Sequence, residues 1–187
     1  MKNDEPITGN ASATTATLTF TNTPLTATGT YQVDVTNDVG TTARTLTIAG
    51  TGDTTFSGVV SNGTGTTTAN SLTINSSGTT ILSNANTYAG GTTLNAGTLV
   101  LSNGTAAGSG TITAANGTTI SMTTSSGVGN AVTLSGANAS VTMTSNQPSA
   151  GYGSNITGSA DQTLVIVNNG NAVNFNNTTR QFANFLG

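Results

Sequence analysis

The chain has 187 residues, of which only 5% are charged, whereas soluble proteins average about 25%. With three basic residues, Lys2, Arg44 and Arg180, and a formal charge of -3, it lacks the cationic surface that binds phosphates or anionic membranes. The absence of Cys excludes disulfides, thiolate zinc sites and Cys nucleophiles. No apolar run approaches the roughly 20 residues of a membrane-spanning helix, so we expect neither nucleic-acid binding nor membrane insertion.

Short runs rich in Val, Ile, Leu and Thr recur along the whole chain. Their alternation predicts half-buried strands, and no comparable stretch has helical spacing. Gly, Asn and Ser separate the runs, including Asn-Gly pairs at 62–63, 103–104 and 116–117, which favour tight turns. The predicted strands in chain order are 18–20, 31–35, 46–48, 56–60, 72–74, 80–82, 92–94, 99–101, 111–113, 119–121, 132–134, 141–143, 164–167 and 173–175.

Many short strands are compatible with a sandwich, a barrel or a solenoid. The chain has no Trp and only 4% aromatic residues, and small side chains suit the narrow interior of a solenoid, where like residues stack on like. We therefore predict an all-β fold of the β-solenoid class. Thr and Asn side chains would form ladders that hydrogen-bond between adjacent coils.

Two segments carry a specific motif, Gly52–Val60 and Asn86–Leu99, the second beginning Asn-Thr-Tyr-Ala-Gly-Gly-Thr-Thr. Residues of about 52–113 resemble the autotransporter-associated β-strand repeat. The resemblance implies a right-handed parallel β-helix of the passenger type found in large exported bacterial proteins. The chain departs from that family at Asn70–Ser83, which is uncharged where the family has a segment containing Lys.

The residues of this motif have roles that can be predicted directly. Gly90 and Gly91 allow a sharp turn where no Cβ would fit, and Gly97 allows the next corner. Tyr88 is expected to pack its ring on the turn.

The N-terminal region has a weaker resemblance of a different kind. Residues of about 15–50, with Gly-Thr-Tyr-Gln-Val-Asp-Val-Thr-Asn at 29–37, are similar to the last three strands of a bacterial immunoglobulin-like domain. Two interpretations remain open: residues 1–50 form a tail and cap that continue the solenoid, or they form a partial immunoglobulin-like unit completed by a neighbouring chain. We divide the chain into 1–50 and a β-solenoid at 51–187.

We predict no catalytic, cofactor-binding or metal site. Asp34, Asp38 and Asp53 are too scattered to form a metal cage, and Asp161 is a lone acid before a strand. Of the two interpretations of Arg180, an anion site and a solvated arginine, we favour the second. Hydroxyl groups are abundant, but the chain has no His and no evident base to activate a nucleophile. The protein is therefore expected not to be an enzyme.

The C-terminal segment is unusual because it holds three of the five Phe residues, at 175, 182 and 185. It predicts either an aromatic cap over the last coil or an apolar end that docks onto the next subunit.

Together these features predict a non-catalytic extracellular or cell-surface structural protein, either a stalk or a filament subunit that associates end to end. The alternative is an adhesin-type passenger fragment that binds glycans or host matrix. Because the N-terminus lacks the apolar core of a signal peptide, an exported form would be a mature or excised segment.

Overall fold

A computed structural model describes residues 17–20, 43–62, 69–147, 151–153, 155–159, 161–168, 174–175 and 180–181, and of 17–20, 168, 174–175 and 180–181 the backbone alone. The described residues form short strands and no helix. The strands are β1 Thr17–Phe20, β2 Thr45–Ile48, β3 Thr54–Phe56, β4 Ser71–Ile74, β5 Thr79–Leu82, β6 Thr92–Leu94, β7 Thr98–Leu101, β8 Ile112–Ala115, β9 Thr119–Met122, β10 Val132–Ser135, β11 Ser140–Ser145, β12 Gly151–Tyr152, β13 Ile156–Thr157, β14 Thr163–Asn168, β15 Asn174–Phe175 and β16 Arg180–Gln181.

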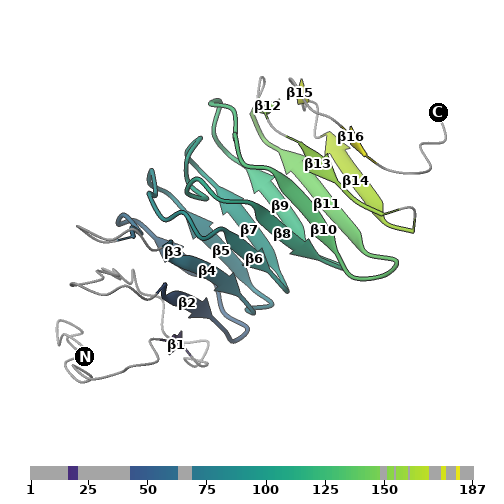
Figure 1. Ribbon diagram of the computed structural model, residues 1–187. Coiled ribbons are helices and arrows are strands. Elements are labelled where there is room, and N and C mark those ends of the chain that lie inside the picture. The colour runs from purple at the N-terminus through teal and green to yellow at the C-terminus, as the bar shows by residue number, and fades with distance from the viewer. Residues whose placement is uncertain are drawn as a thin grey trace.

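All pairings between these strands are parallel. Eight strands form sheet A in the order β1-β2-β4-β6-β8-β10-β13-β16, and six form sheet B in the order β3-β5-β7-β9-β11-β14. The chain passes through sheet A, then through sheet B, and returns one layer further along, so the strands stack from the N-terminal to the C-terminal end (Figure 1). The predicted β-solenoid is confirmed.

The central coils have a constant length. The paired residues Leu72, Thr92, Ile112 and Val132 of sheet A follow one another at intervals of 20 residues. The preceding interval, from Leu46 to Leu72, is 26 residues. Extra residues before and after the central coils lie in the connections, because the strands themselves stay in register.

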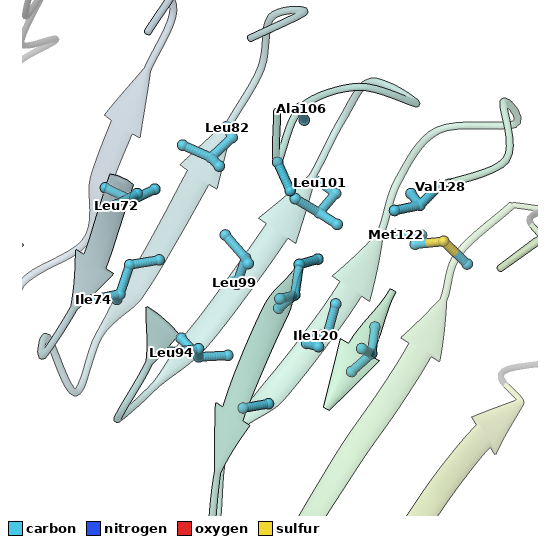
Figure 2. Packing of buried hydrophobic residues seen from close by; sticks show 14 of the residues in the cluster. Leu72, Ile74, Leu82, Leu94, Leu99, Leu101, Ala106, Ile120, Met122 and Val128 are labelled. Atoms are coloured by element: carbon cyan, nitrogen blue, oxygen red, sulfur yellow. The ribbon is translucent and has the colours of Figure 1, made fainter. Parts of the chain in front are cut away.

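The core lies between the two sheets, where apolar side chains of sheet A face those of sheet B (Figure 2). Strands β2, β4, β5 and β7 alternate half-buried and buried residues, as expected when one face of a strand points inward. Parallel register then stacks the inward residues in columns, such as Leu46 on Leu72 and Leu99 on Ile120. Each fully buried Leu or Ile stabilises the fold by about 1.5–3 kcal/mol.

Most predicted strands are present, with local differences. The run at 56–60 is not a strand: β3 ends at Phe56, and Val60 is buried only after the chain has bent past an exposed Ser57. The run at 111–113 shifts to β8, whose two Ala residues pair with β10 despite their low strand propensity. The run at 31–35 lies outside the described residues.

The described strands of the N-terminal region belong to the solenoid. β1 pairs in parallel with β2, and β2 in parallel with β4. This pairing is what the first of the two interpretations, a continuation of the solenoid, requires. The boundary at residue 50 and the immunoglobulin-like strand around Tyr31 stay predictions, since residues 21–42 are outside the described part.

Candidate functional site

The outer face of sheet A carries a regular array of hydroxyl groups. Register places one Thr above another at the same position of successive coils. We call this set the threonine column: Thr47, Thr73, Thr93, Thr113, Thr133 and Thr157. All six are half-buried. The array is uncharged and repeats at the strand spacing of about 4.8 Å.

Some of these hydroxyls bond one another along the solenoid axis. Thr133 Oγ1 and Thr157 Oγ1 are 3.1 Å apart, and at a neighbouring position Thr45 Oγ1 lies 2.8 Å from Ser71 Oγ. A similar contact joins two Asn side chains, since Asn95 Nδ2 donates to Asn75 Oδ1 at 2.8 Å. The predicted hydrogen bonds between like side chains of adjacent coils are therefore observed at Thr133–Thr157 and at Asn75–Asn95.

The described acids act as hydrogen-bond acceptors at corners. Asp53 Oδ1 accepts from the Thr79 N–H of the next coil at 2.7 Å. Asp161 accepts from Ser159 Oγ at 2.6 Å and from the Asn138 N–H at 3.1 Å, and these two bonds, Ser159 first, lower its pKa. The two acids stand in different coils, and the described residues contain no group of three potential metal ligands.

Other predicted candidates are only partly described. Asp34 and Asp38 lie outside the described residues. Arg180 stands in β16 opposite Ile156, and its side chain is not described. Arg44 is half-buried, and its backbone N–H donates to Asn70 Oδ1 at 3.0 Å. No described pair of charged side chains is thus brought together in a catalytic arrangement.

The two described tyrosines belong to the interior. Tyr88 is 0% exposed, and its hydroxyl lies 2.6 Å from Thr92 Oγ1. Burial raises the pKa of Tyr88 to about 12, although the Thr92 hydrogen bond lowers it in part. Tyr152 is 1% exposed, and burial raises its pKa as well. Neither ring is available on the surface to stack on a ligand.

The predicted turn chemistry of the motif is present. Gly91 has a positive φ of 86°, and a Cβ there would lie 2.7 Å from Thr111 O in the next coil. Gly97 has a φ of 70°, and a Cβ there would collide with Gly78 O. The ring of Tyr88 lies against Gly108, where an added Cβ would be 3.2 Å from Tyr88 Cδ2. The expected packing of Tyr88 on a turn is thus observed.

Sequence reasoning missed the buried asparagines that join coils. Asn86 Oδ1 accepts from Val60 N at 2.7 Å, and Asn86 Nδ2 donates to Ala106 O at 2.6 Å, so one side chain bridges the coil before it and the coil after it. Asn130 Nδ2 donates to Gly110 O at 2.7 Å and Gly108 O at 3.0 Å. A signal existed in the recurrence of Asn shortly before a sheet-A strand, but Asn is too common in this chain for it to stand out.

Strand β14 is more exposed than the strands of sheet B that precede it. In β14 three successive residues are exposed: Val165 by 37%, Ile166 by 39% and Val167 by 38%. Ile166 stacks on Met143, which is 0% exposed. The inward column is therefore buried at Met143 and exposed to solvent at Ile166. β14 is the last described strand of sheet B.

Comparison with known proteins gives one family match. Residues 72–101 match the family described as the passenger-associated-transport-repeat. This range runs from β4 to β7 and includes the Tyr88 motif, and it is narrower than the range of about 52–113 expected from the motif. No curated protein and no solved structure matches the chain. Among the described residues there is no helix that could span a membrane.

Proposed function

We propose that this chain is an extracellular, non-catalytic structural segment, a passenger-type β-solenoid that serves as a stalk or as a unit of a filament. The observation that carries the proposal is the unbroken stacking of sheet A, in which β2, β4, β6, β8, β10 and β13 continue in register. The match of residues 72–101 to a passenger-associated repeat supports a location at the cell surface or outside the cell.

The polar chemistry of the described residues fits a structural role. Asp53 and Asp161 use their carboxylates to hold backbone N–H groups of neighbouring corners. General acid–base catalysis needs a titratable group placed beside a reacting atom, and both carboxylates are committed to the fold. Incubation with neutral and acidic polysaccharides, with and without calcium, is expected to release no product, and turnover would overturn this part of the proposal.

End-to-end association is the form of assembly that β14 supports. An edge strand with unpaired backbone groups, exposed Val and Ile residues and no charge recruits a strand from another chain. β14 has the sequence Thr-Leu-Val-Ile-Val-Asn and contains neither charge nor Pro. A second copy that adds a strand there would cover Ile166 and continue the column below it.

The test uses two neighbouring positions that face opposite sides of β14. Ile166→Lys places a charge in the inward column, a device by which natural edge strands block pairing, whereas Val165→Lys places the same charge outside and is the matched control. Light scattering and negative-stain microscopy over a concentration series should show end-to-end oligomers for the wild type and Val165→Lys, and monomers for Ile166→Lys. Circular dichroism would confirm that both variants fold. Monomers at every concentration for the wild type would contradict the filament proposal.

The threonine column supports a second candidate, adhesion to glycans. Its half-exposed hydroxyls at Thr93 and Thr113 can donate to and accept from sugar hydroxyls, whereas the buried Tyr88 and Tyr152 cannot stack on a sugar ring. A glycan array is the measurement: binding that is lost in a Thr93→Val/Thr113→Val variant would favour this candidate, and an array without hits would oppose it.

A further inference from the structure

The turn after β7 contains the dipeptide Asn103-Gly104, in which the Asn side chain accepts hydrogen bonds from a residue of the same turn. Asn103 Oδ1 accepts from Thr105 N at 3.0 Å and from Thr105 Oγ1 at 3.1 Å. Both donors belong to the residue two positions further on, so the carboxamide oxygen is held against the backbone of residues 103–105. Among the described residues, no hydrogen-bond acceptor faces the Gly104 N–H.

From this geometry we propose that Asn103 is a site of spontaneous deamidation, a modification that goes beyond the proposed function. The Gly104 backbone nitrogen loses its proton and forms a bond to Asn103 Cγ. The leaving Nδ2 takes up a proton from water as the Cγ–Nδ2 bond breaks, ammonia leaves, and a five-membered succinimide remains. Water opens this ring at one of its two carbonyls, which yields aspartate or isoaspartate. Glycine favours the step because it has no side chain to hinder the approach.

Thr105 assists the reaction electrostatically. When the Gly104 nitrogen attacks, negative charge develops on Asn103 Oδ1, and donors already aimed at that oxygen stabilise the tetrahedral intermediate. The Thr105 N–H and the Thr105 hydroxyl are such donors. Thr105 is exposed, so its hydroxyl can be removed without disturbing the core.

The chain contains a matched control in Asn116-Gly117, which precedes β9. There Asn116 Oδ1 accepts from Ser140 N at 2.8 Å, and Gly117 N donates to Ser140 O at 2.8 Å. The Ser140 N–H can stabilise charge on Asn116 Oδ1 as the Thr105 donors do on Asn103 Oδ1, but the attacking Gly117 nitrogen is itself bonded to the next coil, and that bond costs about 0.5–1.5 kcal/mol to break. The hydroxyl of Thr118, the equivalent of Thr105, donates elsewhere, to Ala115 O at 2.6 Å.

The two sites, Asn103 and Asn116, can be compared directly because their local sequences match. Both sites read Asn-Gly-Thr, so the two asparagines should react at similar rates in the unfolded chain. A difference that appears only in the folded protein must come from the folded structure, and the Thr105→Val variant tests the part that its hydroxyl contributes. The two other Asn-Gly pairs, at 62–63 and 169–170, include residues outside the described part of the chain, so they do not enter the comparison.

Isoaspartate at position 103 would also disturb the stacking. It adds a carbon to the main chain at a place where Gly104 lies close to the next coil, since a Cβ on Gly104 would be 2.8 Å from Gly127 O. The turn would have to move away from residues 126–127.

The experiment follows deamidation of the whole folded protein at mildly alkaline pH, with pepsin digestion in acid, peptide mass spectrometry and an isoaspartate methyltransferase assay. Asn103 should be modified several-fold faster than Asn116, and the two rates should converge in denaturant. Thr105→Val should slow modification at Asn103 and leave Asn116 unchanged. Asn103→Gln should remove the faster signal. Equal rates in the folded protein, or faster modification of Asn116, would overturn the proposal.

Discussion

Buried threonine hydroxyls differ in whether they have a partner. Thr80 and Thr92 are 0% and 1% exposed. Thr92 Oγ1 bonds the Tyr88 hydroxyl, whereas Thr80 Oγ1 has no hydrogen-bond partner in the part of the chain that the structure describes. A buried hydroxyl without a partner lowers the free energy of unfolding by about 1–3 kcal/mol. Replacing Thr80 with an apolar residue of similar shape can therefore stabilise the fold.

The first prediction compares the same change at these two positions. Thr80→Val removes the unpaired hydroxyl at nearly constant shape and is expected to leave the free energy of unfolding unchanged or to raise it by about 1 kcal/mol. Thr92→Val leaves the Tyr88 hydroxyl buried without a partner and should lower it by about 1–3 kcal/mol. Urea denaturation measures both, and a larger loss for Thr80→Val would contradict the assignment.

A second prediction concerns alkaline pH. Burial raises the pKa of Tyr88 from 10.0 to about 12, so between these values the folded chain keeps a proton that the unfolded chain has lost. Its contribution to stability is complete below pH 10.0 and is lost as the pH rises towards about 12, at up to about 1.4 kcal/mol per pH unit. Tyr88→Phe should be less stable at neutral pH, because Thr92 loses its partner, but should show a shallower decline, measured by denaturation across this range. An identical slope would show that Tyr88 does not titrate in this window.

At the scale of the element, corners decide where one strand can follow another. Gly97 precedes β7 and Gly117 precedes β9, with φ values of 70° and 76°. A Cβ at Gly97 would collide with Gly78 O, whereas at Gly117 nothing lies within 4 Å. The two glycines share a backbone conformation and differ in the space around them.

This difference gives a third prediction. Gly117→Ala should cost about 1–2 kcal/mol of stability, the penalty of the left-handed conformation alone. Gly97→Ala should cost several times more or prevent folding, because the Cβ also displaces the preceding corner. Denaturation midpoints and the amount of folded protein obtained distinguish the two cases. Equal losses of stability would show that the backbone at Gly78 can move away from the new Cβ at little cost.

A strand could be predicted from the sequence only where it was long enough to show alternating polar and apolar residues. The four residues of β2 alternate Thr and aliphatic residues, and that alternation alone indicates a half-buried strand. β12, β13 and β16 have only two residues each, too few for any periodicity. β13 and β16 form where the preceding strand of sheet A offers an edge to pair with. The bonds of Asn86 join residues 26 and 20 positions away, so they follow from coil length, which no local pattern contains.

At the scale of the whole molecule, the composition and the motif predicted the architecture, but they did not predict the individual contacts. Few aromatic residues and a motif around Tyr88 were enough to predict a solenoid, because that fold needs only small inward side chains and tight corners. The exposed end of the core at β14 could not be predicted in this way. Ile166 is as apolar as the buried residues of the inward column to which it belongs, and only its position in the last described strand of sheet B leaves it exposed.

The parallel stacking of 20-residue coils also determines how the molecule responds to a pulling force. The hydrogen bonds between coils run along the long axis. Tension on the two ends therefore breaks the bonds of one coil before it reaches those of the next. A stacked coil occupies about 4.8 Å of that axis, whereas its 20 residues extend to about 70 Å when pulled straight. A tether of this kind would unfold coil by coil and lengthen many-fold before the chain itself is fully extended.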